Sequence, residues 1–130
     1  MIKGELKKIL YVEDDRDIQR IAQLALEKVG GFDVKICSTG REALAEVTDF
    51  CPDLMLLDIM LPEMDGLTIL EALQKNQETT HIPVVFITAR VPADEVIEYQ
   101  KRGALDVISK PFDPMKLASL LKEIWHNRQA

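Results

Sequence analysis

Short apolar runs alternate along this chain with longer segments whose apolar residues recur every three or four positions. The short runs are typical of β-strands, and the longer segments are typical of amphipathic helices. Three of the runs are apolar along nearly their whole length, as expected for strands buried on both faces of a sheet. The expected strands are Lys8–Val12, Phe32–Cys37, Leu54–Leu57, Pro83–Ile87 and Leu105–Ser109.

A helix is expected after each strand. The expected helices cover residues 16–29, 40–51, 66–76, 92–102 and 114–125. Thr39 and Asp113 suit the N-cap positions of the second and the last helix. In the first helix the inward face is expected to carry Ile18, Ile21, Ala22, Ala25 and Val29. A strand followed by a helix, five times over, predicts an α/β domain with a parallel sheet and helices on both of its faces.

Size and charge narrow the possible functions. A chain of 130 residues suits one domain with a real core. The net charge of −6 argues against nucleic acid as a direct partner, because phosphate binding needs clustered Lys and Arg. No apolar run approaches the roughly 20 residues of a membrane span, and no signal-peptide core follows the N-terminus, so a cytoplasmic protein with no membrane partner is expected.

Polar residues stand where four of the expected strands end. Glu13 and Asp14 follow the first strand, Asp58 ends the third, Thr88 the fourth and Lys110 the fifth. In a parallel sheet the carboxyl ends of all strands lie along one edge, which is where ligands bind in open α/β sheets. These side chains are therefore expected to meet in one pocket.

The residue types in this pocket indicate phosphoryl transfer assisted by a hard cation. Carboxylates without His or Cys suit Mg²⁺, with Asp14 and Asp58 as direct ligands and Glu13 acting through water. Asp58 could attack phosphorus to give an aspartyl phosphate. Lys110 would supply positive charge to the transferring oxygens and Thr88 a hydroxyl donor, which is nearly all that such a reaction requires.

Four segments resemble the receiver domain of two-component response regulators, close to the stand-alone chemotaxis type. They are Ile9–Asp15, Asp53–Gly66, Ile82–Ala89 and Gly103–Phe112, in the order and spacing of that family. The resemblance implies a flavodoxin-like sheet with strand order 2-1-3-4-5. It also implies one receiver domain over residues 1–130, with its core at about 7–126, that is phosphorylated and dephosphorylated at Asp58 but turns over no separate substrate.

The family also implies roles for individual residues around Asp58. The backbone carbonyl of Met60 resembles a further Mg²⁺ ligand, and Thr88 resembles the hydroxyl that moves toward the phosphoryl group. A cis peptide bond is implied between Lys110 and Pro111. The acid Asp15 is better interpreted as a helix cap than as part of the acidic pair.

One position departs from the family pattern. Many receivers carry an aromatic residue three positions before the lysine, and here that position is Val107, so the output face is expected to respond less or through helix movement alone. Arg90 and Met60 lie where the family tunes dephosphorylation. Their bulk and charge could shield the phosphoryl group from water, which suggests a longer-lived phosphoprotein than in the fast chemotaxis type.

The partners implied are a sensor histidine kinase or histidine phosphotransfer protein as donor, and a protein bound on the face of the fourth helix, fifth strand and fifth helix. The chain could be a monomer or dimerise on phosphorylation. A non-phosphorylated pseudo-receiver scaffold and a receiver from a hybrid histidine kinase remain alternatives. A haloacid-dehalogenase-type phosphatase would need an Asp at Met60, and a flavodoxin-type nucleotide module would need a Gly-rich loop where Glu13 and Asp14 stand.

Overall fold

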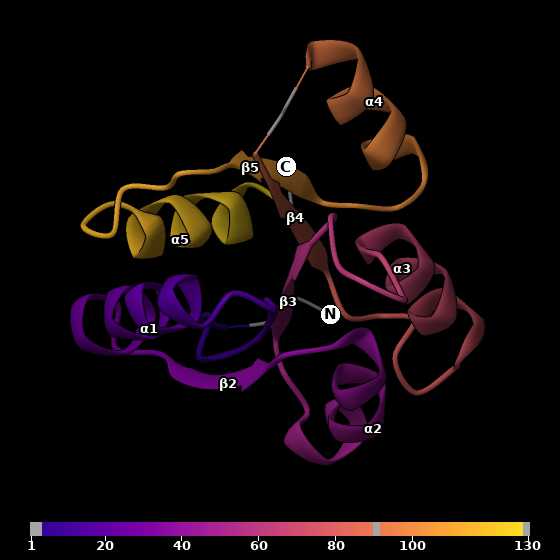
Figure 1. The fold of residues 1–130 in the computed structure, drawn as a ribbon, viewed down its shortest axis with the longest axis horizontal. Helices are drawn as coiled ribbons and strands as arrows, with labels where there is room; N and C mark the ends of the chain where they lie inside the picture. Colours follow the sequence, from indigo (N-terminus) through magenta and orange to yellow (C-terminus); the bar gives the residue numbers. More distant parts are fainter. Residues whose placement is uncertain (1–3, 90–91, 129–130) are drawn as a thin grey trace.

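The computed structural model describes residues 4–89 and 92–128, which form one parallel sheet with helices on both faces (Figure 1). The strands are β1 (Lys8–Val12), β2 (Asp33–Cys37), β3 (Leu54–Asp58), β4 (Val84–Thr88) and β5 (Asp106–Ser109). Their order across the sheet is β2-β1-β3-β4-β5, and every neighbouring pair is parallel. The predicted fold class and strand order are confirmed.

The helices follow the strands as the sequence predicts. They are α1 (Arg16–Leu24), continued by one π-helical segment η1 (Ala25–Val29), then α2 (Gly40–Phe50), α3 (Gly66–Lys75), α4 (Ala93–Lys101) and α5 (Leu117–Asn127). α1 and α5 cover one face of the sheet, and α2, α3 and α4 lie on the other (Figure 1). Among residues 4–89 and 92–128, no helix has the length and apolarity to cross a bilayer.

Two apolar layers hold the helices to the sheet. On the α1 and α5 side, the core includes Tyr11, Leu26 and Trp125. On the other side, Leu57 and Phe86 pack beneath the helices. β3 is buried along its whole length, as expected for the central strand of a sheet covered on both faces.

Trp125 ties the two ends of the described chain together. Its indole Nε1 donates a hydrogen bond of 2.9 Å to the carbonyl oxygen of Gly4, 121 positions earlier in the sequence. The rest of the Trp125 side chain is buried in the core, so the bond anchors the segment before β1 to the last helix.

The first helix differs from the prediction in its second half. η1 replaces regular α-helix, and its wider turn rotates the residues that follow relative to the preceding face. Val29, at the end of η1, was expected to face inward and is 47% exposed, whereas Leu26 is fully buried. Ile21 was also expected to face inward; it lies in α1 before this turn and is 44% exposed.

Two other helix predictions need correction. The last helix begins at Leu117 and not at Pro114, because residues 114–116 form a turn and Lys116 is the N-cap. Asp113 instead caps the turn before it, where its Oδ1 accepts from the Met115 N–H at 2.9 Å. For Ile97 of α4 and Trp125 of α5 the sequence favours core packing over exposure as partner contacts. Ile97 is 55% exposed, which corrects that prediction, whereas Trp125 is buried, which confirms it.

Candidate functional site

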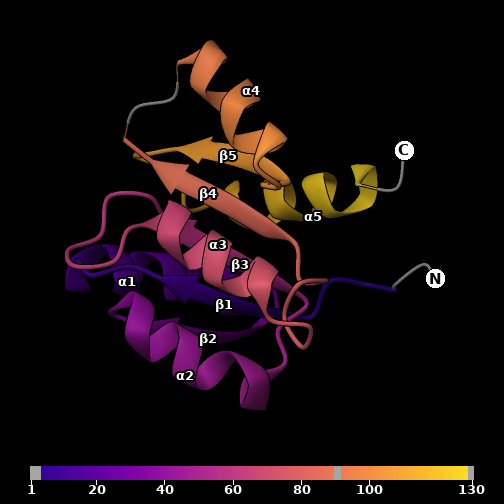
Figure 2. The ribbon, with the colours of Figure 1, turned by 90° about the vertical axis from the view of Figure 1, so that its right-hand side faces the viewer.

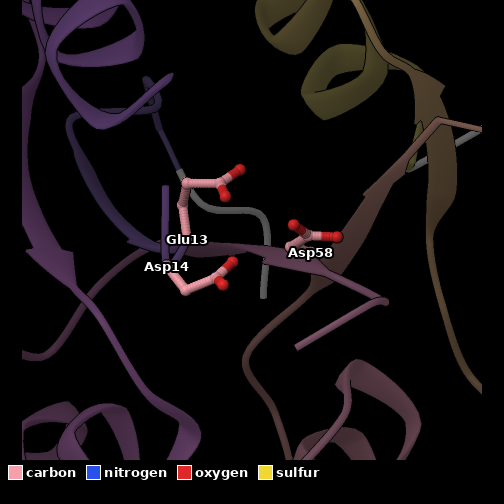
Figure 3. Close-up of side chains that lie close together, drawn as sticks. All are labelled: Glu13, Asp14 and Asp58. Atoms are coloured by element: carbon pink, nitrogen blue, oxygen red, sulfur yellow. The ribbon is translucent and has the colours of Figure 1, made fainter. Parts of the chain in front are cut away.

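The polar residues at the strand ends do meet at one edge of the sheet. Glu13 and Asp14 follow β1, Asp58 and Thr88 are the last residues of β3 and β4, and Lys110 follows β5. All strands point toward this edge (Figure 2). Figure 3 shows the carboxylates of Glu13, Asp14 and Asp58 gathered there, and one oxygen of each lies within 4.8 Å of the others.

Lys110 lies between two of these acids. Its Nζ donates to Glu13 Oε1 at 2.6 Å and to Asp58 Oδ2 at 2.7 Å. Glu13 is only 1% exposed and Asp58 only 4% exposed. In such a poorly solvated place the ammonium supplies charge and hydrogen bonds that water supplies elsewhere. The ammonium of Lys110 is thus close enough to Asp58 to stay paired with negative charge that develops there.

The pKa values at this ion pair reflect burial and pairing together. Burial raises the pKa of Asp58, and the ammonium of Lys110 and the Met60 N–H lower it without cancelling that rise. Burial alone would lower the pKa of Lys110, but hydrogen bonds and charge from Asp58 and Glu13 raise it above its usual range. Lys110 therefore stays an ammonium, while the charge of Asp58 carries a net cost that a further cation would relieve.

The loop after β1 is held by several hydrogen bonds. Glu13 also accepts from the Tyr11 hydroxyl at 2.9 Å and from the Asp15 N–H at 3.1 Å. Gln19 of α1 donates its amide N–H to the Glu13 carbonyl at 2.5 Å and to Ser38 Oγ at 3.1 Å. Asp15 caps α1 by accepting from the N–H groups of the next turn, which confirms its predicted capping role.

Sequence reasoning missed both Tyr11 and Gln19. A signal for Tyr11 was present, because residues two apart on a strand share a face and a buried phenol needs an acceptor. Gln19 gave no comparable signal, since a polar residue on an amphipathic helix is ordinarily solvated.

Three carboxylates could hold a hard cation here. Asp14 is exposed at the edge of the sheet, and no hydrogen-bond donor holds its carboxylate within residues 4–89 and 92–128. The ligand set consists of oxygens alone, which fits Mg²⁺. The Met60 N–H donates to Asp58 Oδ1 at 3.0 Å, so the backbone after β3 turns around the carboxylate. The Met60 carbonyl as a ligand stays a prediction.

Gly66 permits this turn to pack tightly. A Cβ at Gly66 would lie 2.9 Å from the Asp58 carbonyl oxygen and 3.1 Å from Cε1 of Phe86. The Gly66 N–H also bonds to the Ile59 carbonyl at 3.0 Å. A side chain here would push the loop after Asp58 away from α3.

The remaining predicted residues fall in different places. Thr88 is buried at the end of β4, and its carbonyl accepts from the Lys110 N–H at 2.8 Å. The Lys110–Pro111 peptide bond is cis, as the family resemblance implies. The Met60 side chain is 75% exposed beside Asp58. Arg90 lies outside the described residues.

Val107 is half-buried and pairs with Phe86 across the β4–β5 ladder. An aromatic contact stands on the same side of the sheet, where Tyr99 of α4 meets Phe86 edge-on with ring centroids 5.5 Å apart. Tyr99 and Val107 pack against the same apolar layer. An aromatic side chain is thus present near this position, supplied by α4 instead of β5.

An apolar groove of about 400 Å³ is lined in part by Lys110. Its lining residues come from α1 and from the segments after β4 and β5: Ile18, Ile21, Ala89, Lys110, Pro111, Phe112 and Pro114. Ile21 lines this groove and is 44% exposed, and Ile18 beside it is half-buried.

Comparison with known proteins identifies similar chains. Residues 9–122 match the model of the response regulator receiver domain. The chain is 36% identical over 118 residues to the phosphate regulon transcriptional regulatory protein PhoB of Pseudomonas aeruginosa, covering 91% of this chain and 51% of that protein. Across the curated relatives compared, the chain spans 29–53% of their length.

Solved structures are similar over nearly the whole chain. The chemotaxis response regulator CheY4 of Vibrio cholerae superposes with a TM-score of 0.83 at 26% identity, covering 92% of this chain and 98% of that one. A CheY-like receiver domain protein from Methanospirillum hungatei gives a TM-score of 0.81 at 30% identity, with 96% and 98% covered.

Proposed function

Because the chain belongs to the family of response regulator receiver domains of two-component signalling, we propose that Asp58 is its phosphoacceptor. The observation that carries this proposal is the contact of Lys110 Nζ with both Asp58 and Glu13 at the edge of the sheet. A cation held 2.7 Å from a nucleophilic carboxylate is placed to stabilise charge that develops on a transferring phosphoryl group.

In the proposed step a carboxylate oxygen of Asp58 attacks phosphorus. A P–O bond to Asp58 forms while the bond from phosphorus to the donor breaks, and the donor nitrogen or oxygen leaves with the electron pair. Lys110 can then move from Asp58 Oδ2 to a phosphoryl oxygen while it keeps its contact with Glu13. Thr88, at the end of the neighbouring strand, would donate its hydroxyl to another phosphoryl oxygen.

A Mg²⁺ ion fits the three acids beside this lysine. Asp14, Asp58 and the Met60 carbonyl would hold it directly, and Glu13 would act through water. Bound there, the ion would neutralise the carboxylates and the incoming phosphoryl oxygens. The burial-raised pKa of Asp58 supports this assignment, because an acid whose charge is costly gains most from a second cation.

The phosphodonor is proposed to be a histidine on a kinase or phosphotransfer protein in the cytoplasm. A donor of that size must approach Asp58 from the open edge of the sheet, and the groove lined by Ile18, Ile21 and Phe112 borders that edge. Its apolar lining would accept the apolar side chains beside the donor histidine. A downstream protein would bind at α4, β5 and α5.

The response at the output face is proposed to run through α4. Thr88 and Phe86 lie two residues apart on β4 and so share a face of the sheet. Tyr99 packs on Phe86, and no residue of α4 is fully buried, so this helix is lightly attached. When Thr88 shifts, α4 could therefore move with it through the contact of Tyr99 with Phe86. This route does not need an aromatic ring at Val107.

The test is intact-protein mass after incubation with acetyl phosphate and Mg²⁺. A single phosphoryl adduct is expected on the natural chain, and none on Asp58→Asn or after chelation of Mg²⁺. An adduct that persists on Asp58→Asn would refute the assignment of Asp58. No adduct on the natural chain, together with no Mg²⁺ binding by calorimetry, would instead favour a pseudo-receiver scaffold.

A further inference from the structure

Tyr11 places a phenol among the apolar residues of β1, between Leu10 and Val12. It pairs with Leu56 of β3 and Ile36 of β2, and its side chain is fully buried. Its hydroxyl donates to Glu13 Oε1 at 2.9 Å. Burial and the charge of Glu13 both raise the pKa of the Tyr11 hydroxyl, so this group remains a donor. A buried hydroxyl at this position has one visible use, which is to hold Glu13.

The hydrogen bonds of Glu13 divide between its two oxygens. Oε1 accepts from both the Tyr11 hydroxyl and Lys110 Nζ, and Oε2 accepts from the Asp15 N–H. The carboxylate is thus fixed at both ends. The oxygen that Tyr11 binds is the one that meets the lysine.

We infer that Tyr11 is a positioning residue for phosphoryl transfer, acting through Glu13 on Lys110. The inference rests on the proposed phosphorylation of Asp58. With Tyr11 present, Glu13 Oε1 has a fixed location and its charge is shared between two donors. Lys110 is then presented to Asp58 but is not drawn entirely to Glu13, and it remains able to follow the phosphoryl group.

Without the hydroxyl, Lys110 would be the only donor to Glu13 Oε1 among residues 4–89 and 92–128. The carboxylate would gain freedom to rotate, and the lysine would be held more tightly to it. Both effects place the ammonium less well for the transition state, and small misplacements are costly in such sites. Because hydrogen bonds to charged groups are the stronger kind, we expect phosphorylation at saturating Mg²⁺ to slow by about tenfold.

The test is Tyr11→Phe, which keeps the ring and removes only the hydroxyl. Two quantities are measured: the rate of adduct formation from acetyl phosphate at saturating Mg²⁺, and the Mg²⁺ affinity by calorimetry. The rate is expected to fall about tenfold. The Mg²⁺ affinity is expected to stay within about threefold of that of the natural chain. The reason is that Tyr11 binds the same oxygen of Glu13 as Lys110 does, and the substitution leaves the exposed Asp14 unchanged.

Thr79→Val is the matched control. Thr79 is also buried, and its hydroxyl donates to the Leu73 carbonyl at 2.8 Å, at the far end of α3. Thr79→Val should lower the midpoint of thermal unfolding about as much as Tyr11→Phe does, and leave the phosphorylation rate unchanged.

The outcomes separate this inference from the proposed function. If the natural chain takes no phosphoryl group, the proposed function fails. If it is phosphorylated and Tyr11→Phe reacts at the same rate, the inference is overturned. The inference is also overturned if Thr79→Val slows phosphorylation as much as Tyr11→Phe does. It is overturned as well if Tyr11→Phe weakens Mg²⁺ binding enough to account for its whole loss of rate.

Discussion

Replacing Lys110 by methionine should destabilise the protein strongly when no divalent cation is present. Met keeps an apolar stem of similar length but removes the ammonium that lies 2.6 Å from Glu13 and 2.7 Å from Asp58. Breaking a buried ion pair from one side typically costs about 3–5 kcal/mol, and we take about 3 kcal/mol because the side chain of Lys110 is 14% exposed.

That loss can be converted into a melting temperature. The entropy of unfolding is about 2.1 cal/mol/K per residue, or about 0.27 kcal/mol/K for the 130 residues of the chain. A loss of about 3 kcal/mol therefore lowers the midpoint by about 11 °C. Thermal unfolding by circular dichroism in EDTA measures this shift, with the exposed Lys75 replaced by methionine as control.

Magnesium should return part of the lost stability. A cation bound by Asp14 and Asp58 supplies positive charge near the acids that Lys110 leaves behind, and a ligand that binds only the folded state raises its stability. The midpoint of Lys110→Met should therefore rise more with Mg²⁺ than that of the natural chain. A shift no larger than that of Lys75→Met, or a deficit that Mg²⁺ leaves unchanged, would refute this account of the site.

Three further predictions follow from the same geometry. Because burial raises the pKa of Asp58 in the folded protein, the free energy of unfolding should fall as pH rises through that raised value. In urea unfolding, Asp58→Asn should therefore be more stable than the natural chain by about 1 kcal/mol at pH 7 and equally stable near pH 3. Ile21→Ser should slow transfer from a histidine phosphotransfer protein far more than from acetyl phosphate, with stability changed by under about 0.5 kcal/mol. Met60→Gln should shorten the adduct lifetime several-fold by mass spectrometry, because an amide can orient water at the position where the apolar Met60 side chain is predicted to exclude it; an unchanged lifetime would remove Met60 from that role.

The sheet and its polar edge could be predicted because they depend on strong local patterns. An apolar run that ends at Asp58 is unambiguous, and parallel topology then brings the ends of distant strands together without any knowledge of side-chain contacts. The contacts of Lys110 with Glu13 and Asp58 could be expected for the same reason, because Lys110 follows β5 at the same edge of the sheet. The apolar pattern by itself does not single out Tyr11, because a large residue in a strand is expected to be buried. The signal for its role is that a buried phenol needs an acceptor, and Glu13 stands two residues further along the same face.

Helix faces were harder to predict than strands. The widened turn of η1 rotates the residues after Leu24, and periodicity alone assumes a constant turn. Ile97 was misplaced because an apolar residue on an amphipathic helix is ordinarily buried, whereas α4 touches the sheet with half-buried side chains only. Both errors arise from tertiary packing that overrides the local sequence.

The bond between Trp125 and Gly4 has a practical consequence for protein engineering. β1 begins and α5 ends on the side of the sheet away from the strand ends (Figure 2). A fluorescent protein fused at either end would leave the domain on the side away from Asp58, and the two fusions would stand close to each other. The domain is thus suited to insertion into a host protein as a cassette, with short linkers and the reactive edge left open.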